Sequence, residues 1–334
     1  MYGIMRELLF RLPPETAHNV TLNSLDVAHK LGMLNVFSKH PAPCPVNVMG
    51  LEFPNPVGLA AGLDKNADHL DALGALGFGF IEVGTVTPLA QPGNPQPRMF
   101  RLPEHQAIIN RMGFNNHGVD ELVKNVKASS YKGVLGINIG KNKNTPEEQA
   151  IDDYLACLNK VYPYADYVTI NISSPNTPGL RNLQHGSSLD GLLSSLKTAQ
   201  LTLAKEYERY VPLVVKIAPD LEDHEVEVMA QSLLKNEMDG VIATNTTLSR
   251  DGLQSSQAGE AGGLSGKPLQ DKSTRVIELL CKTLQRKIPV IGVGGIDSVE
   301  SAEAKLKAGA SLVQVYTGFI YQGPGLIRSI VSHL

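Results

Sequence analysis

The sequence has 334 residues, enough for one large domain and a small accessory segment. Its 30 Lys and Arg residues against 33 Asp and Glu residues give a formal net charge of −3. The chain therefore lacks the excess positive charge with which nucleic-acid-binding proteins attract phosphates, and we expect a small-molecule ligand and no nucleic acid. The three cysteines are far apart, and no signal peptide is evident, which favours reduced thiols in the cytoplasm.

Two helices are predicted at the start of the chain. Residues 1–12 mix apolar and charged residues in the pattern of a short amphipathic helix. Residues 11–33 begin with prolines, repeat apolar residues at helical spacing and end near Gly32. The Pro-rich stretch 38–56 then predicts a linker and a short hairpin. We place a domain boundary near residue 42, with a helical segment over 1–41 and the main domain over 42–334.

From residue 56 onward, eight short apolar runs alternate with segments of helical periodicity. The runs are almost continuously apolar, as parallel strands buried on both faces must be. They lie at 56–62, 79–85, 133–140, 166–173, 212–218, 240–246, 289–295 and 311–318. Eight such units predict a (β/α)8 TIM barrel, and a doubly wound open sheet is the alternative.

In a (β/α)8 barrel the active site lies at the carboxyl ends of the strands. The eight runs end in polar residues or glycine, namely Lys65, Thr85, Asn138, Asn171, Ser174, Lys216, Thr244, Asn245, Gly294, Gly295, Tyr316 and Thr317. Each of these alone is well explained as a turn residue. Together on one face of the barrel, they predict a binding site.

The residue types at the strand ends argue against several kinds of chemistry. Asp64 is the acidic residue there, whereas glycoside hydrolysis needs two facing carboxyl groups. No HxxxH or HExxH pattern falls at a strand end, so no metal is expected. The stretches 136–142 and 291–298 do not complete a P-loop or a GxGxxG pattern. The glycines of 291–298 would instead bind a single phosphate through backbone N–H groups, which suits a mononucleotide cofactor such as FMN.

Two residue types at the strand ends indicate what the site binds. Lys216 lies within an apolar run, where an ammonium needs a facing anion; reduced flavin is one candidate, and a core carboxylate such as Glu82 is the other. Amides can bind the alternating donors and acceptors of a flat ring, and Lys65 can bind a carboxylate. The amides are those of Asn110, Asn138, Asn171, Asn176 and Asn245. We expect a planar acidic heterocycle as substrate.

Nine motifs resemble those of class 2, quinone-dependent dihydroorotate dehydrogenases, and the resemblance spans essentially the whole chain, including the N-terminal helices with "PETAH". They are "GLAAGLDKN" (58–66), "EVGTVTPLAQPGNPQPRMFRL" (82–102), "INRMGFNNHG" (109–118), "LGINIGKNK" (135–143), "NISSPNTPGLR" (171–181), "VKIAPD" (215–220), "IATNTT" (242–247), "GGLSGKPL" (262–269) and "IGVGGIDS" (291–298). The resemblance implies an FMN-bearing barrel that oxidises dihydroorotate to orotate in pyrimidine synthesis and passes the electrons to a membrane quinone.

The resemblance also implies roles for individual residues. Ser174 would be the catalytic base, where class 1 relatives use a cysteine, and Thr177 or a water would relay the proton. FMN would be lined by Ala61, Gly62, Leu63, Asp64, Lys65, Thr85, Asn138, Asn171, Lys216, Thr244, Gly266, Gly295, Tyr316 and Thr317. The substrate would be bound by Lys65, Asn110, Arg111, Met112, Gly113, Phe114, Asn171, Asn176, Asn245 and Thr246.

The N-terminal helices would lie on the membrane and give a quinone access to the flavin, with Arg101 and His18 on its path. This implies a peripheral protein on the cytoplasmic side of the inner membrane. Without the resemblance, Ser174 is explained as an N-cap or turn serine. Other interpretations are a dihydrouridine synthase, which needs a basic RNA-binding face, a 2-hydroxy-acid oxidase, which needs a histidine base, and a non-enzymatic barrel that binds a phosphorylated ligand at a membrane.

Overall fold

The computed structural model describes residues 2–34 and 41–334. The chain begins with α1 (Tyr2–Phe10) and α2 (Pro14–Lys30), and an antiparallel hairpin of β1 (Val46–Val48) and β2 (Leu51–Phe53) follows. Both predicted helices and the predicted hairpin are therefore present. Met1 and residues 35–40 of the predicted 1–41 segment lie outside the described residues, so the boundary near residue 42 stays a prediction.

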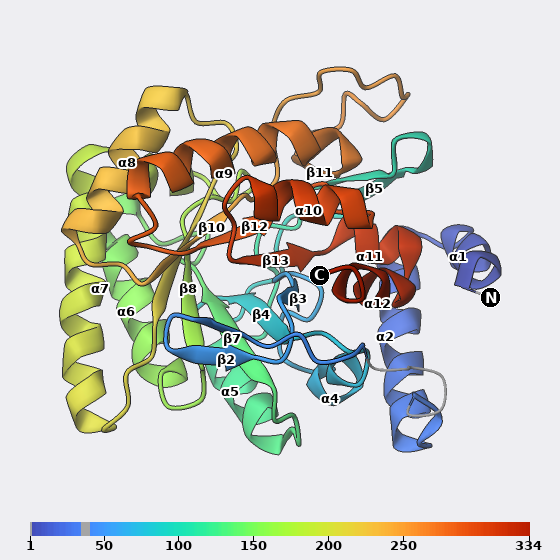
Figure 1. Cartoon of the computed structure of the whole chain (residues 1–334), viewed down its shortest axis with the longest axis horizontal. Helices are drawn as coiled ribbons and strands as arrows, with labels where there is room; N and C mark the ends of the chain where they lie inside the picture. The colour runs from blue at the N-terminus through green and yellow to red at the C-terminus, as the bar shows by residue number, and fades with distance from the viewer. Residues whose placement is uncertain (1, 35–40) are drawn as a thin grey trace.

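Eight parallel strands form a closed barrel (Figure 1). They are β3 (Val57–Leu59), β4 (Phe80–Val86), β7 (Val134–Ile139), β8 (Tyr167–Asn171), β9 (Leu213–Ile217), β10 (Gly240–Ala243), β12 (Val290–Val293) and β13 (Leu312–Val315). Each strand overlaps one of the eight predicted apolar runs. The last strand, β13, pairs with the first, β3, which closes the barrel and excludes the open sheet.

Helices surround the barrel and bury its outer face. They are α4 (Leu70–Gly74), α5 (Val119–Ala128), α6 (Ala150–Val161), α7 (Gly186–Glu206), α8 (Asp223–Lys235), α9 (Gln270–Leu284), α10 (Val299–Lys307), α11 (Thr317–Gln322) and α12 (Gly325–Val331). Their starts follow from local sequence: Glu222 and Ser298 form capping boxes that satisfy the first N–H groups of α8 and α10. Single 3-10 turns lie at Pro103–His105, Glu147–Gln149, Leu180–Gln184 and Lys267–Leu269.

A second, three-stranded sheet lies outside the barrel, and we did not predict it. It consists of β5 (Met99–Leu102), β6 (Ala107–Asn110) and β11 (Gly263–Gly266), which are antiparallel in the order β11-β6-β5. An isolated bridge between Thr247 and Leu264 joins it to the chain that follows β10. The sheet thereby brings the ends of β6 and β11 next to the barrel mouth.

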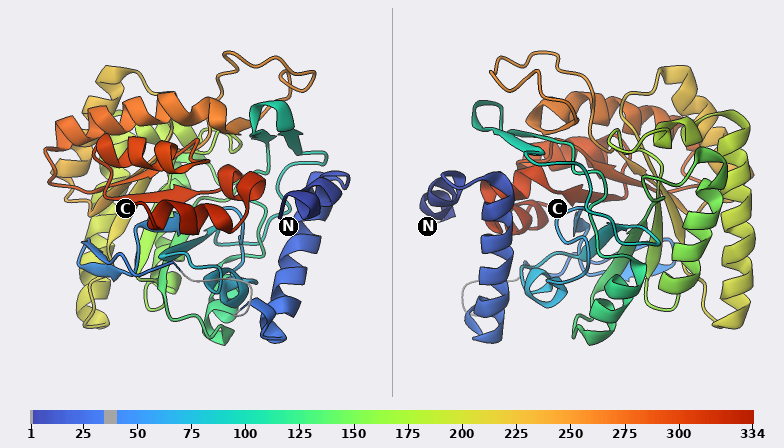
Figure 2. Two further views of the ribbon diagram at one scale, coloured as in Figure 1. Left: turned by 45° about the vertical axis from the view of Figure 1, so that its right-hand side comes forward. Right: turned by 180° about the vertical axis from the view of Figure 1, so that it is seen from behind.

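The N-terminal helices lie together at one side of the barrel (Figure 2). Ala17 and Leu22 of α2 are buried, whereas no residue of α1 is. Tyr2 and Arg6 attach α1 to the C-terminal helices through hydrogen bonds to the carbonyls of Ile320 (2.6 Å) and Tyr321 (2.8 Å). Within residues 2–34 and 41–334, none of the helices combines the length and apolar character that crossing a bilayer requires.

Candidate active site

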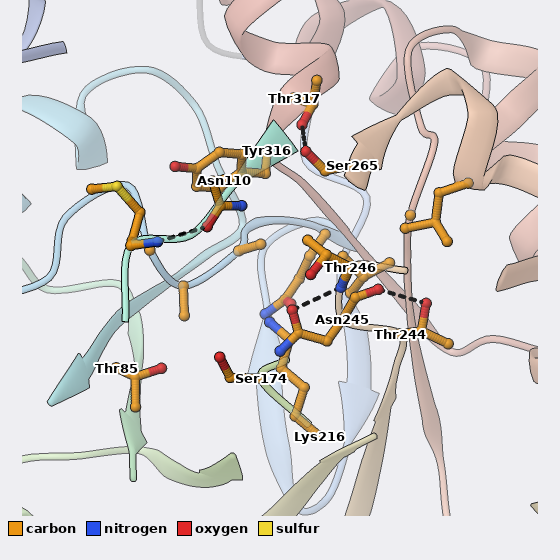
Figure 3. A pocket seen from close by; sticks show the side chains of 18 of the residues that line it. Thr85, Asn110, Ser174, Lys216, Thr244, Asn245, Thr246, Ser265, Tyr316 and Thr317 are labelled. Atoms are coloured by element: carbon orange, nitrogen blue, oxygen red, sulfur yellow. Dashed lines mark hydrogen bonds between the residues drawn. The ribbon is translucent and has the colours of Figure 1, made fainter. Parts of the chain in front are cut away.

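A cavity opens at the carboxyl ends of the barrel strands, with about 1010 Å³ of empty space including its mouth. Ser174 and Lys216 both line this cavity, although Ser174 follows β8 and Lys216 lies within β9 (Figure 3). A base and a buried cation can act on one bound ring only if both lie in the same cavity. The two residues share one cavity.

Most of the predicted site residues line this cavity. They are Ala61, Gly62, Lys65, Thr85, Asn110, Met112, Gly113, Phe114, Asn171, Ser174, Asn176, Lys216, Thr244, Asn245, Thr246, Gly266, Gly295, Tyr316 and Thr317. Four predicted residues do not line it: Leu63, Asp64, Asn138 and Arg111.

The four residues away from the cavity have structural contacts instead. Leu63 belongs to the hydrophobic core. The Asp64 carboxylate accepts the backbone N–H groups of Asp68 and His69 (2.9 Å each), which shapes the loop that carries Lys65. Burial raises the pKa of Asp64, against the lowering effect of these hydrogen bonds.

Asn138 and Arg111 also point elsewhere. Asn138 lies behind Thr85: it accepts the Thr85 hydroxyl (2.6 Å) and donates to Glu82 (2.8 Å). The Arg111 guanidinium forms an ion pair with Glu260 (2.6 Å) and donates to the carbonyl of Pro97 (2.9 Å). The charged group of Arg111 is therefore directed to Glu260, away from the cavity.

Lys65 supplies positive charge at the cavity wall. Its ammonium donates to the carbonyl of Gly62 (2.9 Å). Burial, with the neighbouring charge of Arg98, lowers the pKa of Lys65 to about 8, while the carboxylates of Glu15 and Asp64 oppose this decrease. The ammonium is thus poorly solvated and is suited to bind a carboxylate that enters the cavity.

The loop after β8 positions Ser174. Asn171, the last residue of β8, accepts from the backbone N–H (3.2 Å) and the hydroxyl (3.0 Å) of Ser173, which turns Ser173 inward. Ser174 lies on the cavity wall, and its Oγ accepts the N–H of Asn176 (3.2 Å). The turn interpretation of Ser174 therefore accounts for one contact of its hydroxyl and is compatible with a chemical role.

Amide side chains form a polar wall beside Ser174. Asn245 donates to Ser173 Oγ (3.0 Å) and accepts the N–H of Thr246 (2.7 Å). Asn176 donates to the carbonyl of Asn110 (3.2 Å). Because these amides are held by neighbours on other elements, their free donors and acceptors present a fixed pattern to a flat ring.

Lys216 lies at the base of the cavity above a buried carboxylate. Its Nζ is 3.9 Å from Glu82 Oε1, and Glu82 also accepts from Asn138 (2.8 Å), Tyr167 (3.0 Å) and Gln314 (2.8 Å). Burial lowers the pKa of Lys216, and the charge of Glu82 acts in the opposite direction. Lys216 thus has the core carboxylate of Glu82 as its partner. It also lines the cavity, and its contact with a flavin stays a prediction.

The loop after β12 can approach a ligand closely because it consists of glycines. Gly294 and Gly295 have φ values of 122° and 73°, which side-chain-bearing residues rarely adopt. A Cβ at Gly295 would lie 2.5 Å from the Cα of Gln270. Nearby, Thr317 donates to Ser265 Oγ (2.8 Å). These backbone and hydroxyl groups fit a phosphate, and no metal cluster of three or more ligating side chains occurs within the described ranges.

Sequence reasoning missed several lining residues, chiefly Ser265, Ile296, Gln314 and Gly318. Gln314 carried a signal, since it is a polar residue inside an apolar run. Ser265 carried none, because β11 was not predicted as a strand.

A glycine-rich loop that can hold a phosphate and a buried lysine at the mouth of a (β/α)8 barrel fit a flavin cofactor. A family model described as dihydroorotate dehydrogenase matches residues 44–334. The chain belongs to the dihydroorotate dehydrogenase family, and it is a flavin-dependent oxidoreductase.

Curated relatives of this chain are named as quinone-dependent members of this family. The "Dihydroorotate dehydrogenase (quinone)" of Idiomarina loihiensis is 85% identical over 334 residues, which are 100% of both chains. The protein of that name from Marinobacter nauticus is 64% identical over 99% of this chain and 98% of its own. The crystal structure of DHODH in complex with ferulenol from Eimeria tenella matches with a TM-score of 0.86 and 38% identity, over 95% of this chain and 89% of that chain.

Proposed function

We propose that the cavity oxidises dihydroorotate to orotate in pyrimidine synthesis, with FMN as cofactor, Ser174 as base and a membrane quinone as final electron acceptor. The observation that carries this proposal is the shared cavity of Ser174 and Lys216. In this cavity a bound ring would have the base Ser174 on one side and the buried cation Lys216 on the other. The names of the relatives support the substrate and the quinone.

The cofactor side of the cavity fits FMN. Gly294, Gly295 and Thr317 would bind the phosphate, and Thr85, Asn171 and Lys216 would bind the ring system. FMN, when bound, supplies the acceptor for the hydride that leaves the substrate. Lys216 contributes a positive charge whose position is set by Glu82.

The substrate side of the cavity fits a carboxylated pyrimidine. Lys65 would bind the carboxylate, and Asn110, Asn176 and Asn245 would bind the ring edges. A ring held at several points presents the same carbon atom to Ser174 in each turnover. Lys65 and the amides also stabilise negative charge that develops on the ring.

Ser174 would accept the proton that the ring loses. A serine hydroxyl is a weak base, so the proton needs an outward path. Thr177, three residues further on, has a buried Oγ without a hydrogen-bond partner within the described part of the chain. Pro175 and Pro178, which flank this part of the loop, restrict its backbone conformation. Thr177 would relay the proton from Ser174 outward, directly or through a water molecule.

The N-terminal helices would make peripheral contact with the cytoplasmic face of a membrane. They expose large apolar side chains: Ile4, Met5 and Leu8 on α1, Val20 and Val27 on α2, and Leu31 directly after α2. Such a surface on short helices is typical of a helix that lies in the membrane interface. Arg101 of β5 connects the sheet outside the barrel to the end of α1 by donating to the carbonyls of Phe10 (2.9 Å) and Leu12 (3.0 Å). A quinone would reach the cavity along these helices.

Anaerobic mixing of the purified protein with dihydroorotate tests the proposal. We expect a bound yellow chromophore that bleaches within one turnover and recovers its colour when a quinone is added. Orotate is the control, since the product should perturb the spectrum without bleaching it. A colourless protein, or a chromophore that dihydroorotate does not bleach, would contradict the proposal.

A further inference from the structure

Helix α2 reaches the substrate side of the barrel through one ion pair. The Glu15 carboxylate accepts from Arg98 Nε (2.8 Å) and Nη2 (3.1 Å), and also from Gln96 (2.9 Å). Arg98 is 8% exposed, so its charge is poorly solvated and needs a bidentate partner. This partner comes from the N-terminal helix pair and not from the barrel.

Arg98 also supports the segment that binds the substrate in our proposal. Its Nη1 donates to the carbonyls of Pro92 (2.6 Å) and Asn94 (2.9 Å). Asn94 in turn donates from its side chain to the carbonyl of Arg111 (2.9 Å) and from its backbone to that of Met112 (3.0 Å). Asn94 therefore connects the Glu15–Arg98 pair to Met112, which lines the cavity.

The charges of this pair act on Lys65. Arg98 favours loss of the Lys65 proton, while Glu15 and the buried carboxylate of Asp64 favour its retention. Burial would raise the pKa of Glu15, but the hydrogen bonds and charge of Arg98 hold it below its usual value, so Glu15 is ionised at neutral pH. His18, the other titratable residue of α2 in this region, is neutral there because burial lowers its pKa to about 4.

We propose that Glu15 is a positioning residue of the substrate site, whose carboxylate pairs with Arg98 and offsets its positive charge beside Lys65, the group that binds the substrate carboxylate. Helix α2 thus contributes to substrate binding, separately from its contact with a membrane. This inference deepens the proposed function and rests on it, since it takes Lys65 as the group that binds the carboxylate.

The test measures the affinity of the holoenzyme for orotate as a function of pH, from the perturbation of the flavin spectrum. In the unaltered protein, affinity should fall as the pH rises through about 8, where Lys65 loses its proton. In Glu15→Gln this fall should begin at lower pH, because the negative charge that retains the proton is gone. The dissociation constant should then rise about three- to tenfold near about pH 8 and change little near about pH 6.

Two variants serve as controls. Glu15→Asp keeps the charge and should restore the pH midpoint of the unaltered protein. Glu7→Gln removes the same charge from an exposed position on α1 and should leave the midpoint where it was. The ionisation of orotate itself is common to all four proteins and cancels in the comparison.

The outcomes distinguish a failure of the role of Glu15 from a failure of the proposed function. An unchanged pH midpoint in Glu15→Gln overturns the inference, and so does a loss of affinity that is equal at every pH, since that indicates altered packing alone. If the unaltered holoenzyme does not bind orotate at all, the proposed function fails, and the failure is distinguishable from that of Glu15.

Discussion

Lys216 and Glu82 face each other inside the barrel, with the Lys216 Nζ 3.9 Å from Glu82 Oε1. Glu82 is fully buried and Lys216 is 5% exposed. A buried ion pair is stable only when hydrogen bonds satisfy the remaining lone pairs, and Asn138, Tyr167 and Gln314 provide them here. The base of the cavity is therefore built from a balanced set of charges and dipoles.

Glu82→Gln should destabilise the protein by about 3–5 kcal/mol, because it leaves the ammonium of Lys216 buried without its counterion. Urea unfolding of the flavin-free protein measures the change. The double variant Glu82→Gln/Lys216→Met should regain part of the loss, since no charge then remains buried. Losses that simply add in the double variant would show that the two residues do not interact.

Ser174→Ala should retain flavin and bind orotate, yet lower the rate of flavin reduction by dihydroorotate about 10²- to 10⁴-fold at saturating substrate. Anaerobic rapid mixing measures this rate directly. A variant that reduces its flavin at nearly the original rate would refute the role of Ser174 as base.

The neighbouring Ser173→Ala is a matched control for that experiment. Ser173 is buried and contacts the amides of Asn171 and Asn245, whereas Ser174 lines the cavity. Its loss should therefore weaken orotate binding by disturbing those amides, with a smaller effect on the rate at saturation.

His18 should make stability depend on pH between about 4 and 6.5. The pKa of His18 is lowered to about 4 in the folded chain, whereas its ordinary value, which applies to the unfolded chain, is 6.5. The unfolded chain therefore binds more protons in this window. Stability should thus rise with pH across the window and fall on acidification. His18→Gln should reduce this slope, by at most about 1.4 kcal/mol per pH unit for one proton. Unfolding curves across the window would contradict the prediction if both proteins had the same slope.

The Ile4→Glu/Leu8→Glu variant should weaken binding to phospholipid vesicles by about tenfold or more, because it places two charges on the apolar surface of α1. Both side chains are exposed, at 72% and 58%, so the fold should tolerate the change. Val228→Glu on α8 is the matched control, since it alters an exposed apolar residue away from these helices. Cosedimentation with vesicles measures the effect, and equal binding by all three proteins would contradict a membrane role for α1.

The barrel could be predicted from the sequence because its strands are buried on both faces and therefore read as apolar runs. Its closure was predicted from the number of β/α units, which is eight, and the pairing of β3 with β13 confirms it. The sheet of β5, β6 and β11 was not predicted. Its strands are short, and β11 pairs with β6 across more than a hundred residues of intervening chain.

The sequence by itself determined which chemical groups stand at the strand ends: a serine, two lysines, several amides and a glycine-rich loop. Tertiary structure alone decided which of them meet. Asn138 lies behind Thr85, Arg111 points to Glu260, and Glu15 comes from a distant helix to neutralise Arg98. The physical reason is that side-chain direction, burial and neighbouring charge depend on segments far apart in the chain, and these set the hydrogen bonds and the pKa values in the cavity.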